Sequence, residues 1–172
     1  MNKLVGRAVL PLLGLSLLAG CSPTGGTAAI VNGVAIPDSR VTSFAQGCSA
    51  ALQDQSNPQA ELEPNALRPT MLQLAVLDEM SRQQASGDAQ APTDDQLLEE
   101  VRRRNGEQFL VDERCAEATT ALMRHEHYLL TLRDEYLGSY TVEMNPRYGV
   151  WDPDQLIAVG SSSLSTVDQY QG

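Results

Sequence analysis

Two histidines stand close together in His125-Glu126-His127 and are the residues whose types best fit a metal site. Two zinc ligands on one helix need a spacing of four residues, because that spacing puts both imidazoles on the same face. A spacing of two turns their directions apart by about 200°, at about 100° per residue. The spacing therefore disfavours metal binding, and we expect His125 to be a hydrogen-bonded histidine of the core.

The other residues that could perform catalysis do not form a recognisable site. The chain contains no Gly-x-Ser-x-Gly motif, no P-loop and no dinucleotide-binding fingerprint. The adjacent carboxylates Asp94-Asp95 and Glu99-Glu100 fall on expected helix surfaces. Capping and solvation explain such pairs better than acid–base chemistry does. We therefore expect a protein that is not an enzyme and needs neither a metal nor another cofactor.

The first 20 residues have the pattern of an export signal. Lys3 and Arg7 form a basic start, and an apolar run follows from Ala8 to Ala19. This run is too short to cross a bilayer and remain there. The motif Leu18-Ala19-Gly20-Cys21 comes directly after it and resembles the bacterial lipobox.

The lipobox resemblance implies that Cys21 carries a diacylglyceryl group and that the chain is cleaved before this residue. Acyl chains such as palmitate would tether the protein to the extracytoplasmic face of the cell membrane, since each buried CH₂ adds roughly 0.8 kcal/mol. The alternative is an ordinary signal peptide that leaves Cys21 as a free, reactive thiol. We favour lipidation, followed by a flexible spacer over residues 21–27.

Lipidation of Cys21 leaves Cys48 and Cys115 as a pair among three cysteines. In an oxidising compartment such a pair is expected to form a disulfide. Both residues also fall on the apolar face of an expected helix, so both should face the core. Two buried free thiols are the alternative. A zinc site is disfavoured because no Cys-x-x-Cys spacing occurs.

The chain is acidic, with a formal net charge of −10 over 172 residues. Removal of the signal takes away Lys3 and Arg7 and lowers the charge to −12. A protein of this sign does not attract nucleic acid or an anionic membrane surface through its overall field. We expect no nucleic-acid partner and a membrane contact made by the lipid. Acidity that serves solubility alone is the simpler interpretation of the charge.

The segment that organises the expected fold is the β-branched run Ala28–Ile36, which Asn32-Gly33 interrupts. Both of these residues tolerate positive φ and favour a tight turn or a bulge. A first helix should run from Pro37 or Asp38 to Leu52, because proline and aspartate suit the first turn. Its apolar face comprises Val41, Phe44, Cys48 and Leu52.

Two further helices are expected after a polar loop over residues 54–64. The first starts at Pro69, ends near Gln84 and is apolar enough to be the most enclosed helix. The next begins at the capping box Thr93-Asp94-Asp95-Gln96 and ends at Asn105-Gly106. Its arginines, Arg102 to Arg104, complement the helix dipole, which we favour over a phosphate or peptide contact.

A fourth, long helix is expected from Glu107 or Asp112 to Leu137. A stripe with a period of 3.5 residues predicts one apolar seam along its length. The seam comprises Val111, Cys115, Ala118, Leu122, His125, Leu129, Leu132 and Tyr136.

The segment after the helices alternates like a strand over Tyr140–Met144 and could pair with Ala28–Ile36. A turn at residues 145–149 follows, and the extended chain then continues over residues 150–153. The aromatic residues Tyr140, Tyr148 and Trp151 could hold an apolar peptide segment. The alternative, which we favour, is that their rings cover the helix core. The domain thus spans residues 28–159, and a Ser-rich flexible tail covers residues 160–172.

The run from Ala28 to Val41, Ala-Ala-Ile-Val-Asn-Gly-Val-Ala-Ile-Pro-Asp-Ser-Arg-Val, resembles the opening of SurA-type and PrsA-type chaperones. In that family a Val-Asn-Gly strand leads into the first helix of an N-terminal chaperone domain. The later helices and the closing segment with Asn-Pro-Arg-Tyr-Gly and Trp-Asp are similar to short SurA-N-like lipoproteins of actinobacteria. The resemblance extends over about residues 27–165.

The resemblance implies a mainly helical, four-helix domain with a small β pair formed by the two ends of the chain. Such a domain holds unfolded or exported polypeptides without ATP, in a broad groove that has no residue signature. Enzymatic members add a parvulin-type prolyl isomerase domain. Only 20 residues follow Asp152, fewer than the roughly 50 that a domain needs, so we expect no isomerase activity.

These observations predict a lipid-anchored, extracytoplasmic, chaperone-like module that binds unfolded or exported envelope polypeptides. The alternative is a structural or adaptor lipoprotein that binds one folded envelope partner. A degenerate prolyl isomerase is a third hypothesis, which a proline-isomerisation assay tests.

Overall fold

The computed structural model describes residues 25–53, 64–132, 136–137 and 139–160. The expected signal with Lys3 and Arg7, the lipidation site Cys21, nearly all of the polar loop and the tail after residue 160 lie outside the described residues. None of the described helices combines the length and the apolar character that a membrane span requires.

The interruption expected at Asn32-Gly33 is a tight turn, and it joins the two strands of a hairpin. Strand β1 (Thr27–Val31) pairs antiparallel with β2 (Val34–Pro37) on one edge and with β3 (Val142–Met144) on the other. Asn32 and Gly33 form the turn with φ angles of 47° and 84°, a conformation that these two residue types accept. The Asn32 side chain also accepts a hydrogen bond from the Thr141 amide at 2.8 Å. The predicted pairing of the two ends of the domain is therefore confirmed.

A second sheet has two antiparallel strands, β4 (Val150–Asp152) and β5 (Ile157–Val159). The extended segment at residues 150–153 was predicted, whereas β5 was not, because three residues are too few to show a period of two. A single 3₁₀ turn, η2 (Pro146–Tyr148), joins β3 to β4. Asn145 caps this turn, and its side chain accepts a hydrogen bond from the Arg147 amide.

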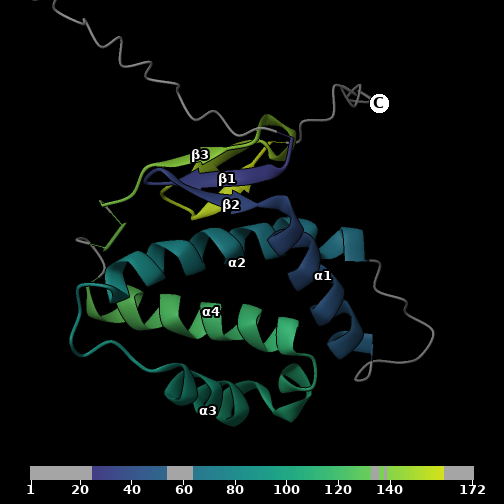
Figure 1. Ribbon diagram of the computed structural model, residues 1–172, viewed down its shortest axis with the longest axis vertical. Coiled ribbons are helices and arrows are strands. Elements are labelled where there is room, and N and C mark those ends of the chain that lie inside the picture. Colours follow the sequence, from purple (N-terminus) through teal and green to yellow (C-terminus); the bar gives the residue numbers. More distant parts are fainter. Residues whose placement is uncertain (1–24, 54–63, 133–135, 138, 161–172) are drawn as a thin grey trace, which may run out of the picture.

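Four α-helices make up most of the described chain and confirm the mainly helical class: α1 (Asp38–Gln53), α2 (Pro64–Ala85), α3 (Asp94–Asn105) and α4 (Glu113–Thr131). In Figure 1 the strands lie against α2, α4 runs beside α2, and α3 lies beyond α4. The predicted capping box is present in α3. The Thr93 side chain accepts from the Gln96 amide, and the Gln96 side chain accepts from the Thr93 amide at 2.8 Å.

Helix α2 begins at Pro64, so the predicted start at Pro69 was wrong. A proline in the first turn costs little, because its missing N–H has no acceptor within the helix there. Pro69 lies inside the helix, where its missing N–H removes one backbone hydrogen bond. Burial of the helix face from Met71 to Ser81 outweighs that loss, in line with the predicted enclosure of this helix.

Helix α4 starts at Glu113, with Asp112 as its N-cap. The Asp112 side chain accepts a hydrogen bond from the Arg114 amide at 2.9 Å. The alternative predicted start at Glu107 was wrong, because residues 107–110 form a 3₁₀ turn, η1 (Glu107–Leu110). Because this turn interrupts the helical repeat, Val111 does not lie on the apolar face of α4. It is 75% exposed and not part of the core.

Helix α4 also ends at Thr131 and not at the predicted Leu137, although Tyr136 and Leu137 are again helical. The reason is the contact between His125 and Tyr136, whose Nδ1 and hydroxyl oxygen lie 2.9 Å apart. A continuous helix would separate these residues by about 16 Å along its axis. The break lets Tyr136 return to the core.

The single seam predicted for α4 is wider than expected, because the helix packs between α2 and α3 and is buried on more than one side. Its buried residues are Cys115, Ala118, Thr120, Ala121, Met123, Arg124, His125 and Tyr128. The main core lies between the strands, α1, α2 and α4. A separate small cluster of Leu97, Val101 and Met123 attaches α3 to α4.

Candidate functional site

The aromatic residues predicted as a peptide contact all lie in or against the main core, although they are buried to different degrees. Trp151 is 9% exposed and belongs to the main core. Tyr140 packs edge-on against Tyr136, with ring centroids 5.5 Å apart. Tyr148 is partly buried against the same core. This placement supports the alternative that the rings cover the core, and peptide contact through them stays a prediction.

The Tyr148 hydroxyl lies in an ionic cluster at the start of α1. It contacts Asp38 and Arg68, and the Asp38 carboxylate also accepts from Arg68 at 2.8 Å and from Arg147 at 2.6 Å. Burial alone would raise the pKa of Asp38, but the hydrogen bond from Tyr148 and the two guanidinium charges lower it below its usual range. The cluster ties the returning chain to the N-terminus of α1.

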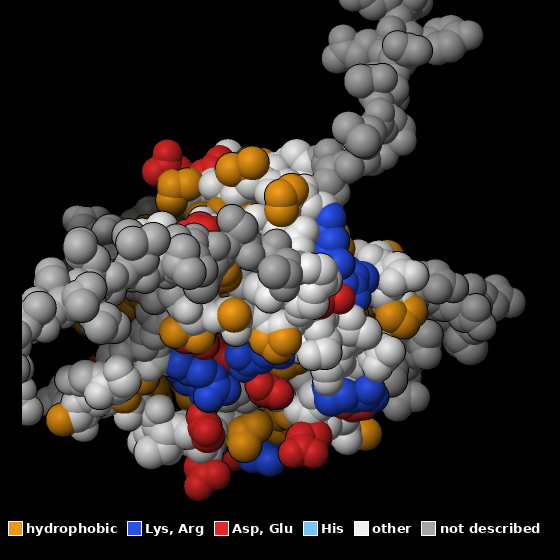
Figure 2. All heavy atoms as spheres, turned by 45° about the horizontal axis from the view of Figure 1, so that its top comes forward, with side chains coloured by type: hydrophobic (Ala, Val, Ile, Leu, Met, Phe, Trp, Pro, Cys, Tyr) orange, Lys and Arg blue, Asp and Glu red, His pale blue; other side chains and the backbone are white. Residues whose placement is uncertain are grey.

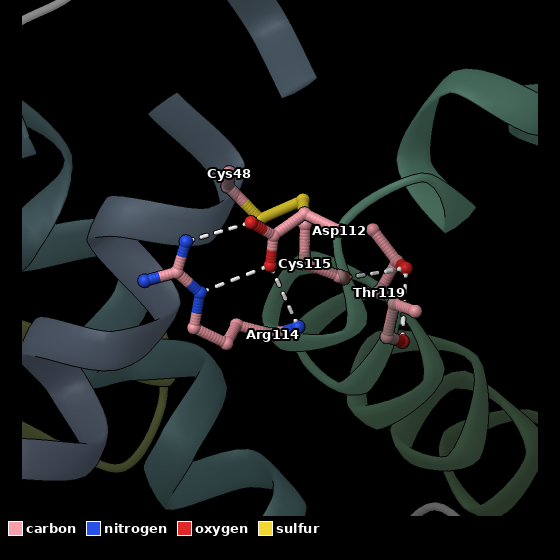
Figure 3. The surroundings of a disulfide bond; sticks show 6 residues. Cys48, Asp112, Arg114, Cys115 and Thr119 are labelled. Atoms are coloured by element: carbon pink, nitrogen blue, oxygen red, sulfur yellow. Dashed lines mark hydrogen bonds and ion pairs between the residues drawn. A yellow bond between two sulfur atoms is a disulfide. The ribbon is translucent and has the colours of Figure 1, made fainter. Parts of the chain in front are cut away.

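A disulfide joins Cys48 of α1 to Cys115 of α4, with Cα atoms 4.6 Å apart (Figure 3). The cysteines are 4% and 0% exposed, so the predicted core position of both is confirmed. Beside them Asp112 accepts hydrogen bonds from the Arg114 guanidinium at 2.7 and 3.0 Å. These bonds, together with backbone amide donors, lower the pKa of Asp112 to about 2.

His125 is a buried, hydrogen-bonded histidine, as predicted, with Tyr136 as its partner. Burial lowers its pKa to about 4 and raises the pKa of Tyr136, because a charge on either ring would lose its hydration. His127 lies instead edge-on to Tyr128, with ring centroids 5.0 Å apart. No group of metal-ligating side chains comes together in the part of the chain that the structure describes.

Asp78 of α2 is a buried carboxylate, 0% exposed, that the sequence pattern does not predict. Three arginines surround it. Its Oδ2 accepts from Arg40 of α1 at 2.5 Å and from Arg82 of α2 at 2.6 Å, and its Oδ1 accepts from Arg124 of α4. A buried carboxylate requires such partners. The signal in the sequence was a charged residue within the apolar stretch of α2, but its partners come from three helices.

Beside this group α2, α3 and α4 enclose an open cleft of about 270 Å³, which we call the α3 cleft. Figure 2 shows hydrophobic side chains between basic and acidic ones on the helical part of the visible face. The cleft is lined by Arg82, Asp94, Leu98, Glu113, Ala116, Glu117, Thr120 and Arg124. Its lining therefore combines apolar surface with charges of both signs.

The hydroxyl of Thr120 in the α3 cleft has no hydrogen-bond partner among the described residues, although the residue is only 6% exposed. A buried polar atom without a partner costs free energy, roughly 1–3 kcal/mol. Such groups are exceptions in folded proteins, and a bound molecule is one way to satisfy them. The oxygen itself is fully buried, so it lies behind the wall of the cleft and not at its surface.

A second groove of about 260 Å³ lies between α3 and α4 and shares none of the residues of the α3 cleft. It contains Leu97, Met123 and Leu130, and Leu130 is 85% exposed. Arg104 and Glu126 form an ion pair of 2.5 Å at this groove. Arg104 therefore binds α4 through this ion pair, in addition to its predicted role at the C-terminal end of the helix dipole.

Comparisons with models of protein families, with curated proteins and with solved structures found no match for this chain. A functional proposal therefore draws on the sequence motifs and on the geometry described above.

Proposed function

We propose that this protein is a lipid-anchored, extracytoplasmic module that binds unfolded or exported polypeptides without ATP, in the manner of the SurA N-terminal domain. The α3 cleft is the observation that carries the proposal. An extended polypeptide has both apolar side chains and unpaired backbone polar groups. The cleft offers Leu98 and Ala116 to the former, and charged side chains such as Glu113 and Glu117 to the latter.

The interaction would be weak and reversible, as a holding chaperone requires. Burial of apolar surface contributes about 25 cal/mol per Å², and binding entropy opposes it. A cleft of about 270 Å³ accommodates one or two side chains and not a folded domain. Affinity for a long client would then come from several contacts, with the second groove at Leu97 and Leu130 adding to the first.

The lipobox at Cys21 and the Cys48–Cys115 disulfide support the proposed location. Disulfides persist in oxidising compartments, where exported chains are still unfolded. The hairpin of β1 and β2 that leads directly into α1 supports the SurA-N-like architecture. The pairing of β3 with β1 supports it further, because the closing strand returns to the opening one.

The test uses the full chain, purified from membranes in detergent, and an unfolded exported protein whose aggregation is followed by light scattering. We expect the wild-type chain to delay aggregation and Leu98→Ser to shorten the delay. Val150→Ser is the matched control, because Val150 is 69% exposed on β4, outside the α3 cleft. Circular dichroism verifies that both variants fold. Failure of the wild-type chain to delay aggregation or to bind extended peptides would overturn the proposal.

A second candidate is the adaptor that binds one folded envelope partner. The observation that favours it is an exposed cross-strand pair on the small sheet. Val150 and Val159 face each other between β4 and β5 and are 69% and 38% exposed. An apolar pair of this kind fits a flat partner surface better than an extended chain. In that case Val150→Ser would abolish the capture of one partner in fixed stoichiometry.

A further inference from the structure

We propose that the end of the domain that carries Gly25 docks on the phospholipid bilayer, with arginines at the headgroup phosphates and two valines at the boundary of the acyl chains. We call this surface the anchor face, and it comprises Arg68, Arg147, Tyr148, Val150 and Val159. The inference rests on the lipid anchor at Cys21, which is part of the proposed function, and it adds a defined orientation of the domain to that anchor.

The first observation is the short chain between the proposed anchor and the described domain. Gly25 follows Cys21 by four positions. Four residues span at most about 14 Å even when they are fully extended. A domain of this size measures about 35 Å across, so the chain cannot bring its far side to the bilayer. The surface around Gly25 is therefore the part that the anchor holds next to the headgroups.

The arginines at this end provide an excess of positive charge. The Arg147 guanidinium donates to the Gly25 carbonyl at 3.2 Å, which places it just before β1. Arg147 and Arg68 both pair with Asp38, so two cations share one carboxylate. The Arg147 side chain is nevertheless 41% exposed. Because a guanidinium has five donors in a planar fork, it can bind phosphate oxygens together with its protein acceptors.

An exposed apolar pair lies beside these arginines. Val150 and Val159 face each other across β4 and β5 and are 69% and 38% exposed. Neighbouring residues of a strand point to opposite faces, so the burial of Trp151 turns this pair outward. A Cβ on Gly149 would lie 2.3 Å from the Val159 carbonyl oxygen, which shows how closely the start of β4 packs on the end of β5. Val150 follows Arg147 by three positions and lies within about 11 Å of it.

A bilayer matches this combination of side chains. Apolar residues beside arginines bind where the headgroup phosphates meet the acyl chains, through apolar burial and attraction to anionic lipids. The Arg147 guanidinium lies 4.9 Å from the centre of the Tyr148 ring, and tyrosine is a residue type that favours this interface. The acidic residues of the same hairpin, Asp152 and Asp154, lie at or next to its turn, at the end remote from the valines.

Docking through the anchor face orients the rest of the domain. In Figure 1 the strands lie on one side of α2, and α3 lies on the other side, beyond α4. On the visible face of Figure 2, hydrophobic and basic side chains lie near each other on the side that carries the strands. The docked domain therefore holds the α3 cleft away from the bilayer, where it can meet exported polypeptides.

The experiment uses the full chain, purified with its lipid and inserted into vesicles of phosphatidylglycerol and phosphatidylcholine. An apolar fluorescent amino acid replaces Val150 in one sample and Val111 in the other. Val111 is the matched control, because it is 75% exposed and lies between η1 and α4. Lipids that carry a spin label just below the headgroup quench nearby fluorophores. We expect at least about 3-fold stronger quenching at position 150, because a docked side chain lies about 5–10 Å deep at this boundary.

The variants locate the effect, with quenching at position 150 as the readout and circular dichroism as the check of folding. Arg147→Gln should lower the ratio of docked to undocked domain about 5-fold in these anionic vesicles. Arg103→Gln removes the same charge from a side chain of α3 that is 69% exposed, and should leave the quenching unchanged. Val159→Ser removes apolar surface from the anchor face without changing an ion pair, and it should also weaken the quenching.

The possible failures are distinguishable. Wild-type chain that does not float with the vesicles would overturn the lipid anchor, and the docking with it. Flotation with equal quenching at positions 150 and 111 would overturn the docking and leave polypeptide binding in place. The valine pair would then be open to the folded partner of an adaptor. An effect of Arg103→Gln as large as that of Arg147→Gln would overturn the assignment to the anchor face.

Discussion

The guanidinium of Arg124 lies against the carboxylate of Asp78, and both side chains are at most 5% exposed. The other end of the same guanidinium bonds to Asp94, at the first position of α3, at 2.6 Å. One arginine thus connects α2, α4 and α3. The walls of the α3 cleft are held in place by this ionic contact and by the small cluster of Leu97, Val101 and Met123.

Replacing Asp78 should therefore destabilise the protein strongly. Asp78→Asn leaves the buried Arg124 and its two neighbouring arginines without their common carboxylate. We expect the free energy of unfolding to fall by about 3–5 kcal/mol, as is usual when one partner of a buried ionic group is removed. Urea denaturation followed by circular dichroism measures it. Glu143→Gln should change stability by less than about 0.5 kcal/mol, and a similarly small effect of Asp78→Asn would contradict the account.

Gly47 provides a second prediction. A Cβ built on Gly47 would lie 2.6 Å from the Arg114 Cβ and 2.9 Å from the Cys115 amide nitrogen, so α1 and α4 approach closely only because this residue has no side chain. In an open helix position Gly→Ala stabilises by about 1 kcal/mol. Here we expect Gly47→Ala to destabilise by about 1–3 kcal/mol through overpacking. Thermal unfolding measures this.

The matched control for Gly47 is Gly87→Ala, because the nearest atom to a Cβ at Gly87 is 4.0 Å away. We expect the control to leave stability unchanged or to raise it by up to about 1 kcal/mol. Equal effects of the two substitutions would contradict the close approach of α1 and α4 at Gly47.

The disulfide should contribute substantially to stability. It closes a loop with a sequence separation of 67 residues, for which the chain-entropy model gives about 4 kcal/mol. The double variant Cys48→Ala and Cys115→Ala should lose about that amount in urea denaturation. Because both cysteines are buried, we also expect reduction by dithiothreitol to be slow in buffer and fast in urea. Fast reduction of the folded chain would contradict the burial.

His125 predicts a loss of stability at mildly acidic pH. Its pKa is about 4 in the folded protein, chiefly because of burial, and about 6.5 in an unfolded chain. The unfolded chain therefore binds more protons between these values, so stability falls as the pH decreases from about 6.5 to about 4. From pH 7 to pH 5 we expect a loss of about 2 kcal/mol in the free energy of unfolding.

The chain has two histidines, so proton NMR resolves this titration directly. His127→Gln leaves His125 as the single histidine and assigns its signal. Urea denaturation of His125→Gln should show a flatter pH dependence over the same range. A midpoint for His125 near 6.5 would contradict the burial and the proposed contact with Tyr136.

The features that the sequence predicts well are those with a local cause. The Asn32-Gly33 turn and the Thr93–Gln96 capping box depend on residues within one turn of each other, and both are present. The Cys48–Cys115 pair follows from counting and from the helical face of each cysteine.

The features that the sequence did not predict depend on contacts between distant elements. Helix α4 ends where Tyr136 returns to contact His125. The turn η1 decides that Val111 lies outside the apolar face of α4. Asp78 belongs to a group whose members come from α1, α2 and α4. The cleft beside Asp78 depends on where α3 packs against the other helices. The apolar pattern of one helix does not indicate that position.

The most direct test of the central claim is photo-crosslinking in living cells, with a photoreactive amino acid in place of Leu98 and mass spectrometry of the captured proteins. The same amino acid at Val150 is the control. We predict that position 98 captures many unrelated exported proteins, mainly before they have folded, and that position 150 captures few of them. Capture of one abundant folded partner at either position, in constant stoichiometry, would contradict the account and identify an adaptor.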